Sequence, residues 1–488
     1  MTRYLVRLLA TGALALTLAL QACATAPATG RNIFTGGMTP EDEVRTGRQE
    51  HPKILAEFGG AYDDPAVRAY VSSLGELLAR TSELPSLDWH FTVLDSPIIN
   101  AFALPGGYVY VTRGLLALAD SEAELAGVLA HEIGHVAARH PAERYGQQVL
   151  GSAAALGVGV LLGSSAGTAA ASDAVGLALL SYSRDQEFEA DFLGVRYLAR
   201  TGHDPQAMAE FLERLLAHDR FQAEQRGRPG EADAFDITKT HPRTADRVER
   251  AIQQAGVRDV TDPIIARDIY LRKIDGMVYG DSPRQGFVRG RRFSHPELGF
   301  TFEVPEGFTL QNTAKRVMAQ GPQGAVIAFD RADRPGYGTM TSYLANDWAQ
   351  GIALQGLQAI DVNGMEAATA WTRLNGRSGT QDWRLVAIRF DRTSVYRFIF
   401  VTPSSLTSPL NAALRHTTYS FRRLSRAEAA ALKPYRLAIY RVRAGDTARR
   451  IAYRMPVEDD PLDHFLVLNG LDARAGLRTG QKVKIITR

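Results

Sequence analysis

The chain has 488 residues, of which 45% are hydrophobic and 22% charged, and its formal net charge is +3. A chain of this length exceeds one ordinary domain, and it holds enough apolar material for more than one core. Because the charge is nearly balanced and no basic stripe dominates, the composition argues against a nucleic-acid partner. We therefore expect a globular protein of about three domains.

The N-terminus has the pattern of a targeting segment. Two arginines precede an apolar run, residues 8–20, that is short for a membrane span. The run leads to Cys23, the single cysteine of the chain, so no internal disulfide can form. The Leu-Gln-Ala-Cys sequence at this point resembles the lipobox of bacterial lipoproteins. That resemblance implies a signal peptide over residues 1–22, lipidation of Cys23 and, because Asp does not follow the cysteine, an outer-membrane anchor facing the periplasm. Secretory cleavage nearby without lipidation is the alternative.

Composition and pattern divide the rest of the chain into a tether and three domains, which makes the fold class α+β and multidomain. Residues 23–38 are rich in Ala, Thr, Gly and Pro and suit a tether. Helical periodicity and two short strands predict a mainly helical domain with a small sheet over residues 39–275. Gly and Pro between 274 and 285 mark a boundary. Alternating strands then predict a small α+β domain of unknown role, residues 286–425, and a last domain covers residues 436–488.

The strongest helical pattern in the first domain covers residues 121–140. Ser121 and Glu124 form a capping-box pattern at its start, and Pro141 marks its end. The uncharged stretch that follows, residues 145–172, has no apolar piece long enough for a typical membrane span. We expect a mobile or protein-buried segment there, able to touch membrane or substrate, in preference to a membrane hairpin.

This helix carries a metal-binding pattern, His-Glu-Ile-Gly-His at residues 131–135. The spacing of i and i+4 puts His131 and His135 on one helix face, where two neutral imidazoles can share one Zn²⁺. Glu132 can take a proton from the attacking water and pass it to the leaving amine. The alternative is an ordinary helix with two solvated histidines. His140 lies five residues past His135, and we expect it to face elsewhere on the helix, either in a structural role or as a favourable charge at the helix C-terminus.

A second helical pattern, residues 185–200, supplies a candidate third ligand. Glu187 and Asp191 are again four residues apart, so they share a helix face. One carboxylate can bind the metal while the other orients a ligand imidazole. Two histidines and one glutamate with a free position for water are a catalytic zinc arrangement. A solvated acidic helix face is the alternative.

Four motifs in order carry a resemblance, at residues 100–107, 114–116, 131–135 and 182–191. With Thr-His-Pro at 240–242 they resemble the zinc metallopeptidase family of the CAAX prenyl proteases, HtpX and the periplasmic protease BepA. The match covers about residues 39–254. It implies a zincin fold of the gluzincin type, peptidase activity and one Zn²⁺ per chain.

The resemblance also implies roles for individual residues. Glu187 corresponds to the third zinc ligand, and Asp191 to an acid that orients a ligand histidine. His241 corresponds to a histidine near the metal, where it can bind transition-state charge or occupy the fourth zinc position as an inhibitory ligand. A capped loop histidine is the alternative for His241. Arg184 and Arg247 are expected to brace the site.

The chain shows no convincing set of transmembrane helices, so it resembles the soluble, exported branch of the family. A prenylated substrate is therefore not implied. The strand pattern within residues 100–111 suggests a sheet edge onto which an extended peptide adds by main-chain hydrogen bonds. Such a site selects unfolded or flexible segments more than a particular sequence.

The last domain has motifs at residues 440–447, 468–470 and 477–485 that resemble a LysM module. The resemblance implies a β-α-α-β fold that binds the N-acetylglucosamine backbone of peptidoglycan. The chain departs from the usual form at Ala448 and in the acidic stretch 458–460. From Lys433 onward, twelve Lys and Arg outnumber six Asp and Glu, which favours an anionic wall polymer. A module that serves only to dock on the peptidase is the alternative.

The sequence thus predicts a lipid-anchored periplasmic zinc endopeptidase that cleaves unfolded or misassembled envelope proteins with Glu132 as general base. Its predicted partners are these substrates, peptidoglycan through the LysM-like domain, and the outer membrane through the lipid anchor. A mostly latent protease acting as a chaperone-like outer-membrane assembly factor is one alternative. A peptidoglycan-directed hydrolase is another.

Overall fold

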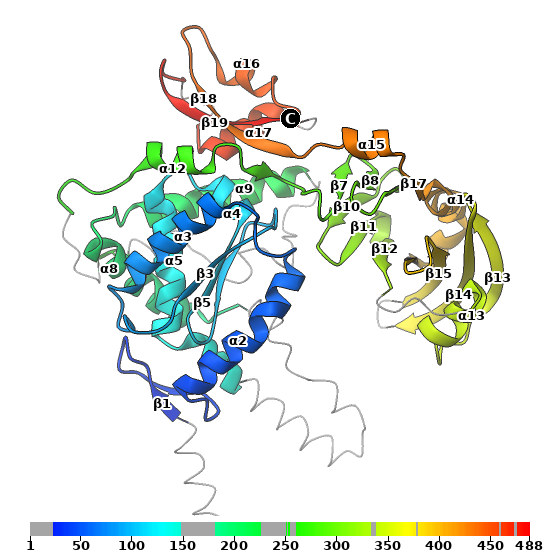
Figure 1. The fold of residues 1–488 in the computed structure, drawn as a ribbon, viewed down its shortest axis with the longest axis horizontal. Helices are drawn as coiled ribbons and strands as arrows, with labels where there is room; N and C mark the ends of the chain where they lie inside the picture. Colours follow the sequence, from blue (N-terminus) through cyan, green and yellow to red (C-terminus); the bar gives the residue numbers. More distant parts are fainter. Residues whose placement is uncertain are drawn as a thin grey trace, which may run out of the picture. The chain divides into compact units, whose positions relative to one another are not determined.

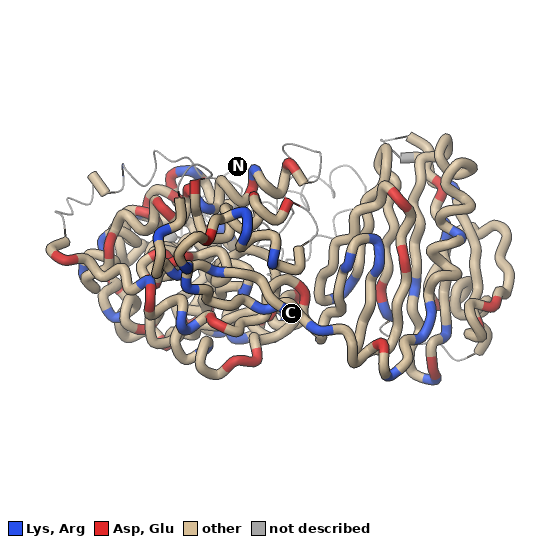
Figure 2. Tube along the Cα trace, turned by 90° about the horizontal axis from the view of Figure 1, so that it is seen from above, with Lys and Arg blue, Asp and Glu red and all other residues tan. Residues whose placement is uncertain are grey.

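The chain forms two compact units in the computed structural model (Figure 1). The structure describes residues 23–147, 181–225, 250, 252–253, 260–332, 338–376, 379–457, 460–472 and 476–488. Unit 1 takes residues up to 55, 60–279 and 436–487, and unit 2 takes residues 56–59 and 280–435. Acidic and basic residues are interspersed on both units (Figure 2). Among the described residues, no helix combines the length and the apolarity needed to cross a membrane.

Unit 1 is built around a small sheet in the order β3-β5-β4. Strand β5 (Tyr108–Thr112) runs parallel to β3 (His90–Leu94) and antiparallel to β4 (Ala101–Leu104). All residues of β4 and β5 are buried. The turn between them uses Gly106 at φ +80°, where a Cβ would lie 2.5 Å from the backbone of Val44. The glycine therefore lets the hairpin pack against the first helix of the unit.

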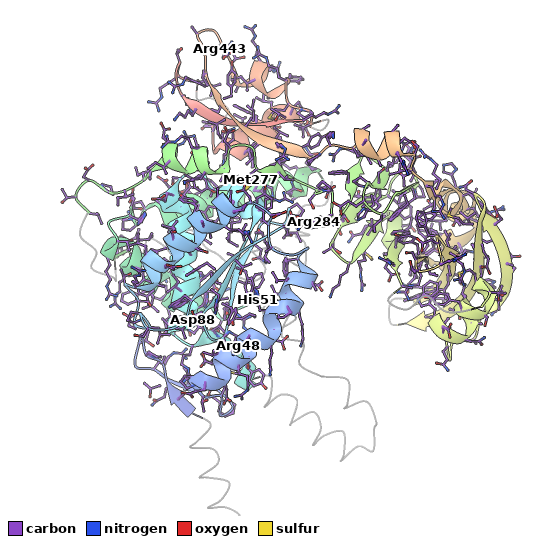
Figure 3. All side chains as sticks on the ribbon, in the orientation of Figure 1. Arg48, His51, Asp88, Met277, Arg284 and Arg443 are labelled. Atoms are coloured by element: carbon purple, nitrogen blue, oxygen red, sulfur yellow. The ribbon has the colours of Figure 1, made fainter. Side chains whose placement is uncertain are left out.

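Helices enclose this sheet. They are α2 (Pro40–Glu57), α3 (Pro65–Ala79), α4 (Arg113–Leu118), α5 (Glu122–Ala137), α8 (Arg184–Arg200), α9 (Ala207–Gln225) and α12 (Arg267–Ile274), and a two-stranded ribbon, β1 (Cys23–Thr25) and β2 (Asn32–Phe34), precedes them. His51 of α2 lies beside the sheet (Figure 3), and its Nδ1 is 2.8 Å from the hydroxyl of Tyr110 in β5.

Helix α5 is the central helix, and every residue from Ala123 to Ala137 is buried. It approaches α8 closely because glycines face the contact: a Cβ on Gly134 would lie 2.9 Å from the carbonyl oxygen of Ala190, and one on Gly194 would lie 3.2 Å from the amide nitrogen of His131. The two glycines therefore bring the metal-binding motif of α5 against the acidic motif of α8.

Both ends of α5 differ in detail from the sequence prediction. Ser121 caps the first turn by accepting from the amide of Glu124 at 3.1 Å. The Glu124 carboxylate, however, accepts from the amide of Asp120 at 2.8 Å, one residue before the cap. The helix ends at Ala137, and Arg139 follows with φ 58°. The prediction of a helix to residue 140 is wrong because this left-handed residue turns the chain away.

The C-terminal part of unit 1 has the order β18 (Tyr435–Arg441), α16 (Ala448–Ala452), α17 (Pro461–Asn469) and β19 (Lys482–Thr487). This is the β-α-α-β order that the sequence predicts. In its sheet β18 lies between β19 and β6 (Val278–Tyr279). Because β6 and β18 are neighbouring strands, the chain leaves unit 1 after β6 and returns to the adjacent strand after unit 2.

Unit 2 contains a seven-stranded antiparallel sheet in the order β10-β11-β12-β16-β15-β14-β13 and a four-stranded sheet in the order β17-β9-β8-β7. The alternating aromatic strands predicted by the sequence form a shared core that includes Phe300, Phe302, Phe329 and Phe398. Helix α14 (Ser404–Ser420) packs against β9, β15 and β16. The strands are β7 (Phe287–Arg289), β8 (Arg292–His295), β9 (Phe300–Glu303), β10 (Thr309–Asn312), β11 (Arg316–Gln320), β12 (Val326–Arg331), β13 (Gln355–Val362), β14 (Met365–Gly376), β15 (Gly379–Arg389), β16 (Val395–Pro403) and β17 (Arg422–Arg423), and the remaining helical segments are η2 (Pro322–Gly324), α13 (Met340–Ser342), η3 (Tyr343–Trp348) and α15 (Arg426–Ala431).

Candidate active site

Two histidines of α5 and a glutamate of α8 converge in the interior of unit 1. His131, His135 and Glu187 are 3%, 0% and 0% exposed, and their potential ligand atoms all lie within 4.8 Å of one another. The two Nε2 atoms are 3.0 Å apart, and the Glu187 carboxylate oxygens lie 3.7 and 3.5 Å from them. Two nitrogen ligands of one tetrahedral zinc ion stand roughly 3.4 Å apart. The spacing and chemistry of these three groups therefore fit a single Zn²⁺.

Neighbouring side chains orient both imidazoles. The Nδ1 atom of His131 is 2.9 Å from the Asp191 carboxylate, which can only accept a hydrogen bond when ionised. His131 therefore carries its proton on Nδ1 and directs the lone pair of Nε2 toward the cluster. A carboxylate that holds a ligand histidine in this way fixes its tautomer and raises its basicity.

His135 is oriented through a longer chain of contacts. Its Nδ1 lies 2.8 Å from the Nδ1 of His140, and the Nε2 of His140 lies 3.0 Å from the Glu189 carboxylate. Because the carboxylate accepts, His140 donates from Nε2 and accepts at Nδ1 from His135. Burial lowers the pKa of His135 well below its ordinary value, so its imidazole is neutral and the Nε2 lone pair faces the cluster.

The prediction that His140 faces away from the site is wrong. It rested on helical spacing, but the helix ends before this residue, and the left-handed turn at Arg139 brings His140 back beside His135. His140 is fully buried and connects the ligand His135 to the Glu189 carboxylate, so its structural role is to orient a metal ligand.

Glu132 is fully buried on α5, one residue after the first ligand. The negative charges of Glu187 and Glu132 both act on Arg144, so these three charged groups lie near one another. The proposed role of Glu132 as general base rests on this location beside the metal cluster.

Sequence reasoning missed two residues that line the site. The ring of Tyr182 stacks on His135 with centroids 3.9 Å apart, and the guanidinium of Arg144 lies 3.3 Å from the centre of the Tyr182 ring. Burial lowers the pKa of Arg144 and raises that of Tyr182. Tyr182 is the first residue of the 182–191 motif, so the sequence held a signal that could have identified it. Arg144 lies in no motif, so the sequence held no such signal for it.

The remaining predicted residues are not brought to the cluster within the described residues. Arg184 is exposed at the first position of α8 and makes no hydrogen bond or ion pair with described residues, so its role in bracing the site stays a prediction. Arg144 is an arginine near the cluster, because the charges of Glu187 and Glu132 act on it. His241, Arg247 and residues 148–172 lie outside the described residues, as does the side chain of Cys23.

Comparison with known proteins relates the region that holds this site to a family. Residues 65–255 match the model of peptidase family M48, and residues 440–485 match that of the LysM domain. The chain carries an M48 peptidase domain. It is 34% identical over 227 residues to the beta-barrel assembly-enhancing protease of Escherichia coli, which covers 43% of each chain. It is 35% identical over 208 residues to the protease of that name from Yersinia pestis, covering 39% of this chain and 40% of the relative.

A eukaryotic relative matches the same region. The mitochondrial metalloendopeptidase OMA1 of Schizosaccharomyces pombe is 32% identical over 212 residues, covering 43% of this chain and 59% of the relative. The chain thus spans less than two thirds of the length of these relatives. For the M48 domain, the predicted family, the metalloendopeptidase class and the zinc cofactor are confirmed, because the family consists of zinc-dependent peptidases and the His-His-Glu cluster is present.

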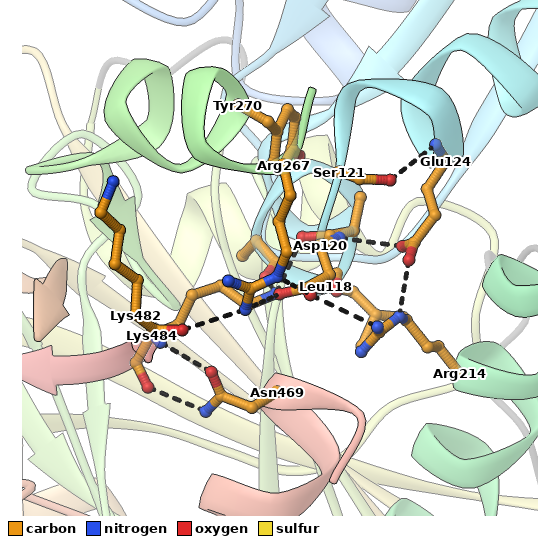
Figure 4. A network of polar contacts seen from close by, with 12 residues as sticks. Leu118, Asp120, Ser121, Glu124, Arg214, Arg267, Tyr270, Asn469, Lys482 and Lys484 are labelled. Carbon is orange, nitrogen blue, oxygen red and sulfur yellow. Dashed lines mark hydrogen bonds and ion pairs between the residues drawn. The ribbon is translucent and has the colours of Figure 1, made fainter. Parts of the chain in front are cut away.

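The LysM domain docks on the M48 domain at the N-terminal end of α5 (Figure 4). Lys484 of β19 is fully buried, and its ammonium group donates to the carbonyl oxygens of Ala117, Leu118 and Ala119 at 3.0, 2.9 and 2.8 Å. These carbonyls belong to the last two residues of α4 and to its C-cap, Ala119, just before α5 begins. The lysine therefore caps one helix of the M48 domain from a strand of the LysM domain.

Charged residues of the M48 domain and of α12 surround this contact. Asp120 accepts from Arg267 at 2.5 and 3.1 Å and lies 3.8 Å from the Lys484 ammonium. Arg214 of α9 binds the Glu124 carboxylate at 3.0 Å. Arg267 also donates to the carbonyl of Lys482 in β19 at 3.1 Å. The contact is therefore a network of ion pairs and hydrogen bonds that reaches the LysM domain through Lys482 and Lys484.

Proposed function

We propose that the chain is a zinc endopeptidase that cleaves unfolded or misassembled proteins of the bacterial envelope. The observation that carries the proposal is the buried convergence of His131, His135 and Glu187 beside Glu132, within an M48 domain. The Nε2 atoms of both histidines face the cluster, because the Nδ1 of His131 lies 2.9 Å from the Asp191 carboxylate and the Nδ1 of His135 is hydrogen-bonded to His140. We assign these three residues as the zinc ligands and Glu132 as the general base.

The chemistry is peptide hydrolysis. When bound, zinc supplies a Lewis acid for the scissile carbonyl and lowers the pKa of water. Glu132 accepts a proton on its carboxylate as the water oxygen bonds to the carbonyl carbon, and it returns that proton to the amine nitrogen as the carbon–nitrogen bond breaks. Asp191 and His140 hold the two imidazoles in place through this cycle. The buried setting of Glu132 keeps bulk water from competing for its proton.

The sheet of unit 1 suggests how a substrate is held. Strand β4 lies at the edge of the described sheet and packs against α5. An extended segment that adds to this edge would run beside the helix that carries Glu132. Main-chain hydrogen bonds would supply affinity without demanding a particular sequence. This geometry favours unfolded substrates, because a folded protein does not offer a free strand.

The proposed place of action is the periplasmic side of the outer membrane. The lipobox-like sequence before Cys23 supports a lipid anchor, and the LysM match supports peptidoglycan as a partner. Arg443, on the loop after β18, is exposed and available to an anionic polymer (Figure 3). Lys484 is engaged with the M48 domain, so it does not contribute to such a surface.

A chaperone-like role in outer-membrane assembly is a second candidate. The observation that favours it is the name of the bacterial relatives, beta-barrel assembly-enhancing protease. In that case proteolysis would be mostly latent, with His241 as a candidate inhibitory ligand. The match to a peptidase family favours both candidates over a peptidoglycan hydrolase.

The deciding experiment is digestion of casein, an unfolded protein, by wild type and by Glu132→Gln, with zinc measured in both. We expect wild type to cleave and the variant to lose about 10²- to 10⁴-fold in rate, with about one zinc in each. Equal cleavage by both proteins would overturn the general-base assignment. Bound zinc without cleavage by either protein would favour the assembly role, and no zinc in either would refute the proposal.

A further inference from the structure

Unit 2 contains a cavity of about 340 Å³ between one face of its seven-stranded sheet and α14. It is lined by residues of β13, β14, β15 and β16 and by the inner face of the helix. The volume is at the lower end of the range typical of small-molecule sites. All lining residues belong to unit 2, so the cavity is independent of the peptidase site.

The floor of the cavity is a row of residues on adjacent strands. Trp371 of β14 is the cross-strand partner of Arg384 in β15, and Arg384 is the partner of Phe400 in β16. Residues that are paired directly across strands project from the same face of a sheet. The half-buried Arg384 guanidinium group is therefore flanked by an indole on one side and a phenyl ring on the other.

A second arginine lies opposite this row. Arg415 of α14 lines the same cavity, and its positive charge acts on Arg384. Burial, and then the neighbouring charge of Arg415, lower the pKa of Arg384. Neither arginine side chain makes a hydrogen bond or ion pair within the described residues. Two like charges thus face one cavity without an acidic partner among those residues.

The one acidic residue in the lining is already engaged. Both carboxylate oxygens of Asp382 accept from Arg373, at 2.6 and 3.1 Å, and Thr407 donates to one of them at 2.6 Å. These contacts lower the pKa of Asp382, so it stays ionised and paired with Arg373. The charge of the cavity is consequently set by Arg384 and Arg415.

We propose that this cavity binds a small ligand with a doubly negative head group, held by Arg384 and Arg415, and with a flat or apolar part that Trp371 and Phe400 cover. Phosphate monoesters and compounds with two adjacent carboxylates share this chemistry. Arginine forms paired hydrogen bonds with both kinds of head group. The middle unit of the chain is then a ligand-binding domain.

The test is calorimetric titration of the whole chain with phenyl phosphate. We expect saturable binding that weakens about tenfold in Arg384→Gln and in Arg415→Gln, since each loses one charged contact of roughly this strength. Arg316→Gln is the matched control, because Arg316 is an exposed arginine on β11 of the same sheet, and it should bind as wild type does. Arg415 is exposed, so its variant keeps the test decisive if Arg384→Gln fails to fold.

Further titrations distinguish the head groups. Tighter binding of phenyl phosphate than of phthalate would identify a phosphate ester as the preferred ligand, and the reverse order would identify a dicarboxylate; either result supports the proposal. Phenol, which lacks the charge, should bind at least tenfold more weakly. The proposal would be overturned if phenol bound as tightly as phenyl phosphate, or if all three arginine variants lost affinity equally. It would also be overturned if phenyl phosphate did not bind at concentrations below about 10 mM.

Discussion

Buried charged and polar groups at the two ends of α5 are paired in different ways. At the N-terminal end, Asp120 and Glu124 are paired with three cations, Arg214, Arg267 and Lys484. At the other end, the atoms that converge from the two ligand histidines and Glu187 all carry lone pairs. In the first arrangement the acids are paired with cations of the chain itself, whereas the ligand atoms of the second fit a bound cation. One helix therefore joins a docking contact to a metal centre.

This difference predicts a separation of effects. Changes at the N-terminal end should lower stability and leave zinc binding intact in the folded protein. Changes at the other end should remove zinc and alter stability mainly through the lost ion.

The largest effect is expected from Glu187→Ala. It deletes one of three ligands, so zinc affinity should fall by more than the roughly 10- to 100-fold typical of changes to residues that only orient a ligand. The loss of affinity is checked by dialysing the protein and measuring the number of zinc ions bound per chain by mass spectrometry. Asp185→Ala is the control, because Asp185 is an exposed acid in the first turn of the same helix. Unchanged zinc in the Glu187 variant would give the ligand role to another residue.

The next effect is on stability, in Lys484→Met. The substitution keeps the apolar stem but leaves three buried carbonyls without their donor and Asp120 with one fewer cation. Loss of one partner from a buried charged network costs about 3 kcal/mol or more. Chemical denaturation followed by circular dichroism should show this loss, while folded protein keeps its zinc.

Lys482→Met provides the matched control. Lys482 lies two residues away on the same strand but pairs with the exposed Asp268. Surface pairs of this kind contribute about 1 kcal/mol or less. Equal destabilisation by both substitutions would mean that the buried lysine is not what holds the two domains together.

A smaller effect is expected from His140→Phe. The ring keeps its volume but cannot accept from His135, so the ligand loses its orientation. We expect zinc affinity to fall by about 10- to 100-fold, measured by competition with a chelator. His140→Asn restores a polar acceptor and should recover part of the affinity. If both variants bind zinc as wild type does, His140 only fills space.

The sequence predicted what lies within one helix and failed where the chain turns or distant segments meet. Helical spacing alone paired His131 with His135 and Glu187 with Asp191. It misplaced His140, because a non-glycine residue with positive φ, Arg139, could not be foreseen from residue types. The order of the M48 and LysM domains followed from their motifs.

Lys484 shows why the rest could not be predicted. As one of twelve basic residues in the last segment, it counted toward a surface for an anionic polymer. Its burial depends on carbonyls more than 360 residues earlier in the chain, at the end of α4. Local pattern therefore assigned the LysM fold correctly, and only the tertiary structure separates the cations that dock from those that remain exposed.

The smallest effect is a pH dependence at this same lysine. Burial lowers the pKa of Lys484 from 10.5 to about 8. Between these two values the unfolded chain binds more protons than the folded chain, so the contribution of this position to stability rises with pH across that window. Thermal unfolding of wild type and Lys484→Met at pH 7, 8, 9 and 10 should show the advantage of wild type growing above about pH 8. An advantage that stays constant over this range would mean that the lysine keeps its charge, and that the carbonyls and Asp120 offset the cost of its burial.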